Sequence, residues 1–164
     1  MLKIENISYK GLYDKNYLCF NDKYGLAAFI NDTIRLTLLN NPNNNCNEKT
    51  SILFAVEDGD VVGRHILYPT VVRCFSDIIS AQSSGSTEVH QSQRGKGIGS
   101  KINQYTLTND EYPLYLCSLL SQSCLSIMRK KESGCTIFDF PQFIKLVNTE
   151  PIFASRGIKG LPLK

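Results

Sequence analysis

The chain has 164 residues, of which 42% are hydrophobic and 20% are charged, and its formal net charge is +3. This length and composition fit one folded domain and exclude an intrinsically disordered chain. The positive charge is mild and scattered, so we expect no nucleic-acid partner. No stretch approaches the ~20 apolar residues that a membrane helix needs, so we expect no membrane partner either.

Six cysteines occur in the chain, and none of them forms a C-x-x-C pair. With only two histidines beside them, a zinc site is poorly supplied, and we expect no metal. Most of the cysteines lie in apolar runs such as "LYLCSLL". This placement favours free, buried thiols over a disulfide framework, and it predicts a reducing, cytoplasmic location.

The first clear element lies between residues 26 and 39. Its apolar residues are separated by three and four positions, which predicts one amphipathic helix. They are Leu26, Phe29, Ile30, Ile34, Leu38 and Leu39. The Asn-rich segment 40–50 predicts a loop that ends this helix.

A β-hairpin is predicted next. Residues 52–56 and 61–68 are β-prone runs joined by Asp58-Gly59, a strong hairpin signal. Residues 71–75 predict a further strand, and Pro69 before it predicts a bend, a bulge or a sheet edge. The polar segment that follows carries the weakest β signal, with residues 87–91 extended at most.

A helix of about ten residues is predicted after residue 97, because Ile98, Ile102 and Tyr105 recur at helical spacing and Pro113 follows. A buried strand is predicted around 113–120, a helix in 121–133 and a strand in 135–140. Helices alternating with strands in this order predict a mixed α/β layout around one sheet.

The stretch "QRGKGIGSKI" carries the clearest chemical signal. Gly95, Gly97 and Gly99 permit positive φ and close approach of a guest, and the free N–H groups of a helix start follow them. Such backbone donors form an anion site, and Arg94 and Lys96 add positive charge, so a phosphate or pyrophosphate is the natural guest. The alternative is a plain turn whose glycines relieve close packing.

Two common nucleotide motifs do not fit this stretch. The P-loop pattern is absent, and a G-x-G-x-x-G fingerprint would need glycine at Ser100 or Ile102. A phosphate-binding domain of another kind, such as a nucleotide binder, stays open as an alternative.

Residues 94–99 match the pattern [Q/R]-x-x-G-x-[G/A] and resemble the acetyl-CoA pyrophosphate motif of the GNAT superfamily of N-acetyltransferases. "VHQSQRGKGIGSKI" is similar to the strand, turn and helix start of that family. "LSIMRKKESGCTIFDF" resembles its late helix and strand, with Cys135 where an aromatic residue is frequent. The resemblance covers about residues 25–145. It implies an α+β fold, with a single central, mostly antiparallel sheet flanked by helices.

By this resemblance, residues 1–164 form a single GNAT-like domain. The tail, residues 146–164, closes no obvious element. This leaves open a longer protein whose second domain completes the acceptor pocket.

The resemblance also implies a reaction, which is direct transfer of an acetyl group from acetyl-CoA, as co-substrate, to a primary amine of a small molecule or peptide. The backbone of Val89 and Gln91, with His90 between them, would flank the pantetheine arm. The amides from Gly95 to Ser100 would hold the pyrophosphate. The implied binding residues are Val89, His90, Gln91, Arg94, Gly95, Lys96, Gly97, Ile98, Gly99, Ser100 and Ser121. Ser121 or Ser123 stands where many members carry a cofactor-contacting Asn, and the alternative role is a helix cap.

Two side chains are candidates for proton transfer. Glu88 is the carboxylate nearest the motif on the preceding strand, and the alternative is a solvated strand residue. His90 lies on the same side of the strand by alternation and could act as a base at neutral pH, and the alternative is a surface histidine.

The tyrosine that often protonates the thiolate in this family is absent from the matching segment, residues 127–130. Tyr105, Tyr112 or Tyr115 could replace it. Cys117 and Cys124 allow a ping-pong thiol route, and their alternative role is core packing.

These departures leave a second function open, a catalytically degenerate acyl-CoA-binding or protein-interaction module of the same fold. Exposed strand edges are compatible with a homodimer. The acceptor is not determined by the sequence, because loops build such pockets.

Overall fold

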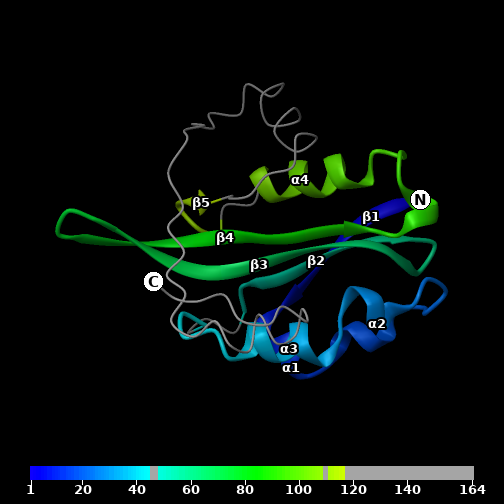
Figure 1. The fold of residues 1–164 in the computed structure, drawn as a ribbon, viewed down its shortest axis with the longest axis horizontal. Helices are drawn as coiled ribbons and strands as arrows, with labels where there is room; N and C mark the ends of the chain where they lie inside the picture. Colours follow the sequence, from blue (N-terminus) through cyan, green and yellow to red (C-terminus); the bar gives the residue numbers. More distant parts are fainter. Residues whose placement is uncertain (45–47, 109–110, 117–164) are drawn as a thin grey trace, which may run out of the picture. The chain divides into compact units, whose positions relative to one another are not determined.

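The computed structural model describes residues 1–44, 48–108 and 111–116, without the side chain of Cys74, and all of them belong to the compact unit Met1–Ser133. Five strands of this part form one sheet in the order β1-β2-β3-β4-β5 (Figure 1). They are β1 (Leu2–Ser8), β2 (Thr50–Glu57), β3 (Asp60–Cys74), β4 (Asp77–Val89) and β5 (Tyr115–Leu116). The first four strands are antiparallel neighbours, and β5 runs parallel to β4. The predicted α+β, mostly antiparallel sheet is confirmed.

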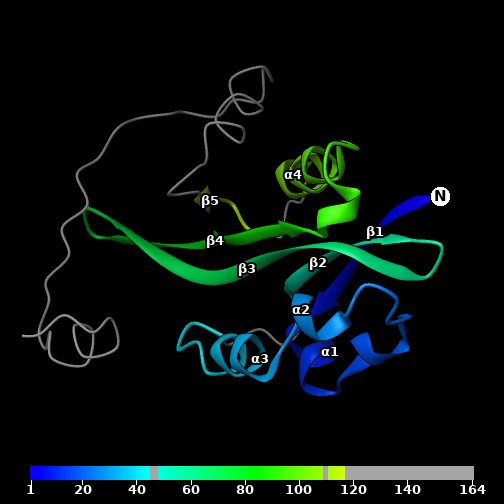
Figure 2. The same cartoon turned by 45° about the vertical axis from the view of Figure 1, so that its right-hand side comes forward.

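Helices cover both faces of the sheet (Figures 1 and 2). One face carries α1 (Tyr9–Tyr13), η1 (Asn16–Cys19), α2 (Leu26–Phe29) and α3 (Asp32–Leu39), and the other carries α4 (Ile98–Thr108). The first face packs a core that includes Leu12, Phe29 and Phe54, and the second packs a smaller core around Leu53 and Ile102. Because both of its faces are covered, β2 is buried along nearly its whole length.

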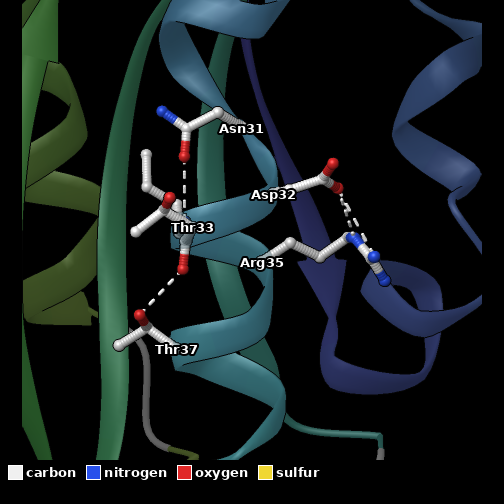
Figure 3. A network of polar contacts seen from close by, with 6 residues as sticks. Asn31, Asp32, Thr33, Arg35 and Thr37 are labelled. Carbon is white, nitrogen blue, oxygen red and sulfur yellow. Dashed lines mark hydrogen bonds and ion pairs between the residues drawn. The ribbon is translucent and has the colours of Figure 1, made fainter.

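The single helix predicted for residues 26–39 is wrong, because the structure divides it into α2 and α3. Ile30 adopts an extended conformation, with φ at −144°. Asn31 then caps α3, because its side-chain oxygen accepts a hydrogen bond of 3.0 Å from the Ile34 amide (Figure 3). An Asn in this position starts a new helix in preference to continuing the old one.

The hairpin joining β2 to β3 at Asp58-Gly59 is confirmed. Pro69 lies at a sheet edge, one of the three predicted features, because the ladder with β2 ends at Ile66 and β3 continues beyond it paired with β4. It lies within the strand opposite Gln82, and the register irregularity falls at His65 to Leu67. The expected strand at 71–75 is therefore a continuation of β3.

The polar segment after residue 76 is a long strand, β4, which the sequence analysis underestimated. Most of its residues are exposed or half-buried, so it shows no apolar signal. It forms through its ladder with β3, from Gly63 opposite Val89 to Cys74 opposite Asp77. The two strands make a long hairpin that is visible in both views (Figures 1 and 2).

The N-terminal elements β1 and α1 were not predicted. Tyr9 anchors this region, because its buried hydroxyl donates a hydrogen bond of 2.7 Å to the Leu67 carbonyl of β3. Burial raises the pKa of Tyr9 far above the usual tyrosine value, so this hydroxyl stays a donor. Cys19 is free as expected, but it is exposed, in contrast to the predicted buried thiol.

No helix in residues 1–44, 48–108 and 111–116 is long and apolar enough to span a bilayer. The elements predicted beyond residue 116 lie outside the described residues. So do Cys117, Ser121, Ser123, Cys124 and Cys135.

Candidate functional site

The glycine stretch joins the end of β4 to the start of α4, as predicted. The last ladder bond of the strand runs from the His90 amide to the Val62 carbonyl, at 2.9 Å. A short 3-10 helix, η2 (Gln91–Gln93), follows, and α4 begins at Ile98. Residues 94–97 therefore form the turn between them.

The glycines of this turn are not explained by close packing. A Cβ atom added to Gly95, Gly97 or Gly99 would meet no heavy atom within 4 Å. Gly95 and Gly97 have φ values of 83° and 76°, so the turn itself requires glycine there. Gly99 has neither positive φ nor a close neighbour, and space beside it is open to a guest.

The turn also carries backbone donors that lack a backbone acceptor. The amides from Gly95 to Ser100 have no backbone acceptor among the residues that the structure describes, and the first that does, Lys101, donates to the Gly97 carbonyl at 3.1 Å. The free amides of a turn and a helix start favour an anion, and the helix dipole adds to this preference. The turn is therefore a candidate site for a phosphate group.

The side chains of the turn hold it in shape. Arg94 Nε donates to the Val89 carbonyl at 3.2 Å, and Lys96 Nζ donates to Oε1 of Gln93. Gln93 is buried and donates in turn to the Tyr24 hydroxyl at 2.7 Å. Both cations therefore stay beside the turn, and Tyr24 ties the turn to the loop before α2.

Glu88 is neither free nor fully solvated. It lies opposite Arg64 in the β3–β4 ladder, and its Oε2 accepts a bond of 2.9 Å from Nη2 of Arg64. The Glu88 side chain is 44% exposed, whereas that of Arg64 is 7% exposed. The carboxylate is thus held by the buried Arg64 and stays partly exposed to solvent.

His90 is less suited to accept a proton. Its Nδ1 accepts a bond of 3.3 Å from the Ser92 amide and lies 2.9 Å from the Ser92 hydroxyl. The neutral ring must then carry its hydrogen on Nε2, which leaves no free acceptor nitrogen. The ring packs against that of Tyr24, with centroids 4.8 Å apart.

A buried polar cluster surrounds His65 on the face of the sheet that α4 covers. Nδ1 lies 2.7 Å from the Thr87 hydroxyl, and Nε2 lies 3.1 Å from the Tyr115 hydroxyl and 3.3 Å from that of Ser84. Burial, followed by the charge of Arg64, lowers the pKa of His65 to about 4. His65 is therefore neutral at physiological pH.

The three candidate tyrosines occupy different places. Tyr115 joins the His65 cluster at the start of β5, and Tyr112 lies under Lys49, whose Nζ is 3.7 Å from the ring centroid. Tyr105 borders an open hollow of about 310 Å³ beside Ile4 and Lys101. Only Tyr115 lies next to β4.

Sequence reasoning missed Arg64, His65, Gln93 and Tyr24. One signal was present, because "VVGRHIL" places two polar residues inside an apolar strand. A buried polar residue in such a run needs partners, which marks a polar site. The partners themselves could not be read from the sequence.

The fold is similar to that of solved acetyltransferases. The ribosomal-protein-alanine N-acetyltransferase of Brucella melitensis biovar Abortus 2308 is 18% identical, with a TM-score of 0.54 over 89% of this chain and 99% of that chain. A GNAT family acetyltransferase of Staphylococcus aureus is 11% identical, with a TM-score of 0.52 over 89% and 98%. AAC(6′)-Iy, solved with the bisubstrate analogue CoA-S-monomethyl-acetylneamine, is 12% identical, with a TM-score of 0.52 over 89% and 98%.

These likenesses show that the chain has the GNAT acetyltransferase fold, which the glycine motif predicts. No protein-family model matches the chain, and no curated protein matches it.

Proposed function

We propose that this protein is an acetyl-CoA-dependent N-acetyltransferase that transfers the acetyl group directly to a primary amine. One observation carries the proposal. In a chain with the GNAT fold, the turn from Arg94 to Gly99 combines amides that have no backbone acceptor among the described residues with glycines whose Cβ positions are open. Acetyl-CoA, the co-substrate, supplies the acetyl group as an activated thioester.

The chain's own residues divide the work as follows. The amides of residues 95–100 hold the pyrophosphate, and the backbone of Val89 to Gln91 flanks the pantetheine arm, as the resemblance implies. Glu88 accepts a proton from the amine as the amine nitrogen bonds the acetyl carbon and the C–S bond breaks, so that the CoA thiolate leaves. Ser121, which lies outside the described residues, stays a predicted cofactor contact.

A second candidate is the catalytically degenerate module of the same fold. It is favoured by the ion pair of Glu88 with Arg64 and by the occupied Nδ1 of His90, because these bonds already engage atoms that a catalytic base would offer to the amine. This module would bind acetyl-CoA without turning it over.

Binding is tested first, by thermal unfolding with acetyl-CoA and with ADP and NAD as controls. At about a hundred times the dissociation constant, a ligand that binds only the folded state stabilises it by about 2.7 kcal/mol. We expect acetyl-CoA alone to raise Tm. A shift with ADP or NAD of equal size would favour a nucleotide binder, and no shift at all would reject the proposal.

Gly97→Asn separates a phosphate cradle from a plain turn. Asn tolerates positive φ, so the turn is kept, but its side chain enters the open space. We expect the variant to fold and to lose the acetyl-CoA shift. Gly25→Asn is the matched control, since Gly25 has a φ of 74° and no neighbour within 4 Å of its Cβ position, but lies outside the turn.

Turnover is measured as release of the CoA thiol in the presence of a panel of primary amines. Amine-dependent release supports the transferase, and binding without release supports the degenerate module. The homodimer and the cytoplasmic location stay predictions.

A further inference from the structure

Arg64 is an unusual residue for its position in β3. Its guanidinium is almost fully buried, on the face of the sheet where α1, α2 and α3 pack, opposite Phe54 in the ladder with β2. Within the described part of the chain, Nη2 bonds Oε2 of Glu88, whereas Nε and Nη1 are buried without a hydrogen-bond partner. Glu88 is the only carboxylate that this guanidinium contacts among the described residues.

Such an arrangement is costly for stability alone. A buried guanidinium loses its hydration, and two of its donors gain nothing in return. An apolar side chain of similar volume would pack beside Phe54 without this penalty. The position of Arg64 is therefore better explained by what it does to Glu88 than by what it adds to the core.

We propose that Arg64 is a positioning residue for acetyl transfer, and the inference rests on the proposed function. It holds Glu88 through Oε2 and fixes the rotation of the carboxylate. Oε1, which accepts no hydrogen bond from the described residues, then points one lone pair at the open side. There it accepts an N–H of the acceptor amine and orients the nitrogen for attack on the thioester carbonyl.

The acceptor class follows from this geometry. A single, fixed oxygen can orient an amine that carries at least one N–H, so primary and secondary amines fit and tertiary amines do not. The guanidinium also offsets the carboxylate charge, so orientation contributes more than attraction of a cation. Arg64 itself, with its side chain 7% exposed, does not touch the acceptor.

A double-mutant cycle tests this coupling in the full chain, with Arg64→Met, Glu88→Gln and the double variant. Rates are measured with acetyl-CoA and the most active primary amine of the panel. We expect Arg64→Met to lower kcat about 10- to 100-fold, the size of effect that misplacement of a reacting group produces. The KM for acetyl-CoA should not change. In the Glu88→Gln background, Arg64→Met should cost no further activity.

Arg64→Lys keeps the charge without the planar fork, and it should retain more activity than Arg64→Met. Arg35→Met is the matched control, because Arg35 also bonds an aspartate, Asp32, but on α3 away from β4. It should leave kcat unchanged.

Stability gives a readout that does not need activity. Glu88→Gln leaves the buried charge of Arg64 without its partner, so we expect Tm to fall by about 5 °C or more. Adding Arg64→Met should restore most of this loss.

Equal losses of kcat from Arg64→Met in both backgrounds would overturn the inference. A wild-type protein that binds acetyl-CoA but transfers nothing, or that fails to bind it, would instead reject the proposed function on which the inference rests.

Discussion

Gln93 and Tyr24 are joined by a hydrogen bond of 2.7 Å, from the side-chain amide of one to the hydroxyl of the other, across 69 residues of sequence. Gln93 is buried directly before the glycine turn, and Tyr24 just precedes α2, one of the helices on the first face of the sheet. The bond therefore links the candidate cofactor turn to the helices that cover the Glu88 side of the sheet.

Tyr24→Phe should weaken acetyl-CoA binding without unfolding the protein. It leaves the buried amide of Gln93 without its acceptor, which costs about 1–3 kcal/mol and loosens the turn. We expect an increase in the acetyl-CoA Kd of at least about fivefold, since each 1.4 kcal/mol is tenfold. Isothermal calorimetry measures it. Tyr13→Phe is the control, because Tyr13 is 72% exposed, and an equal loss there would contradict the assignment.

His65 should make the protein sensitive to acid. Burial lowers the pKa of His65 to about 4, whereas an unfolded histidine titrates near 6.5, so the unfolded state binds more protons between these values. The contribution of neutral His65 to the free energy of unfolding is therefore fully present above about pH 6.5. As the pH drops toward 4, the free energy of unfolding falls by about 3 kcal/mol.

Urea unfolding at pH 7, 6, 5 and 4 measures this loss. The His65→Asn variant should lack the histidine part of it, although its stability at pH 7 is lower. His90→Asn should keep the full loss. If His65→Asn lost stability with acid as steeply as the wild type, other groups would be responsible.

The cap of α3 should contribute measurably to stability. Oδ1 of Asn31 accepts a hydrogen bond of 3.0 Å from the Ile34 amide. In the same helix, Oγ1 of Thr37 donates a hydrogen bond of 2.8 Å to the Thr33 carbonyl (Figure 3). Asn31→Ala should lower the free energy of unfolding by about 1 kcal/mol. Thermal or urea unfolding measures it.

Asp32→Asn provides the comparison on the neighbouring residue. The pair of Asp32 with Arg35 spans 3.4 Å, and Asp32 is 86% exposed, so this ion pair should contribute little. A larger loss from Asp32→Asn than from Asn31→Ala would contradict the cap as the main contribution.

Local chemistry in the sequence determined several elements of this protein. Asp58-Gly59 predicted the β2–β3 turn, and the spacing of Ile98, Ile102 and Tyr105 predicted α4. The three glycines and Arg94 predicted a turn before that helix and, by resemblance, the GNAT fold. Each of these signals lies within about ten neighbouring residues, so the backbone geometry they require is visible in the sequence itself.

Tertiary contacts decided the rest. The length of β4 was underestimated from its polar sequence, because this strand is stabilised by pairing with β3 and not by an apolar face. The helix predicted for residues 26–39 is divided at Asn31, because the side chain of Asn31 caps α3 by accepting a hydrogen bond from the Ile34 amide. Glu88 bonds Arg64, which is 24 residues away in the sequence, and Gln93 bonds Tyr24, which is 69 residues away. The sequence determined which side chains could do chemistry, and only folding decided which of them meet, because a partner's identity depends on strand register and helix packing.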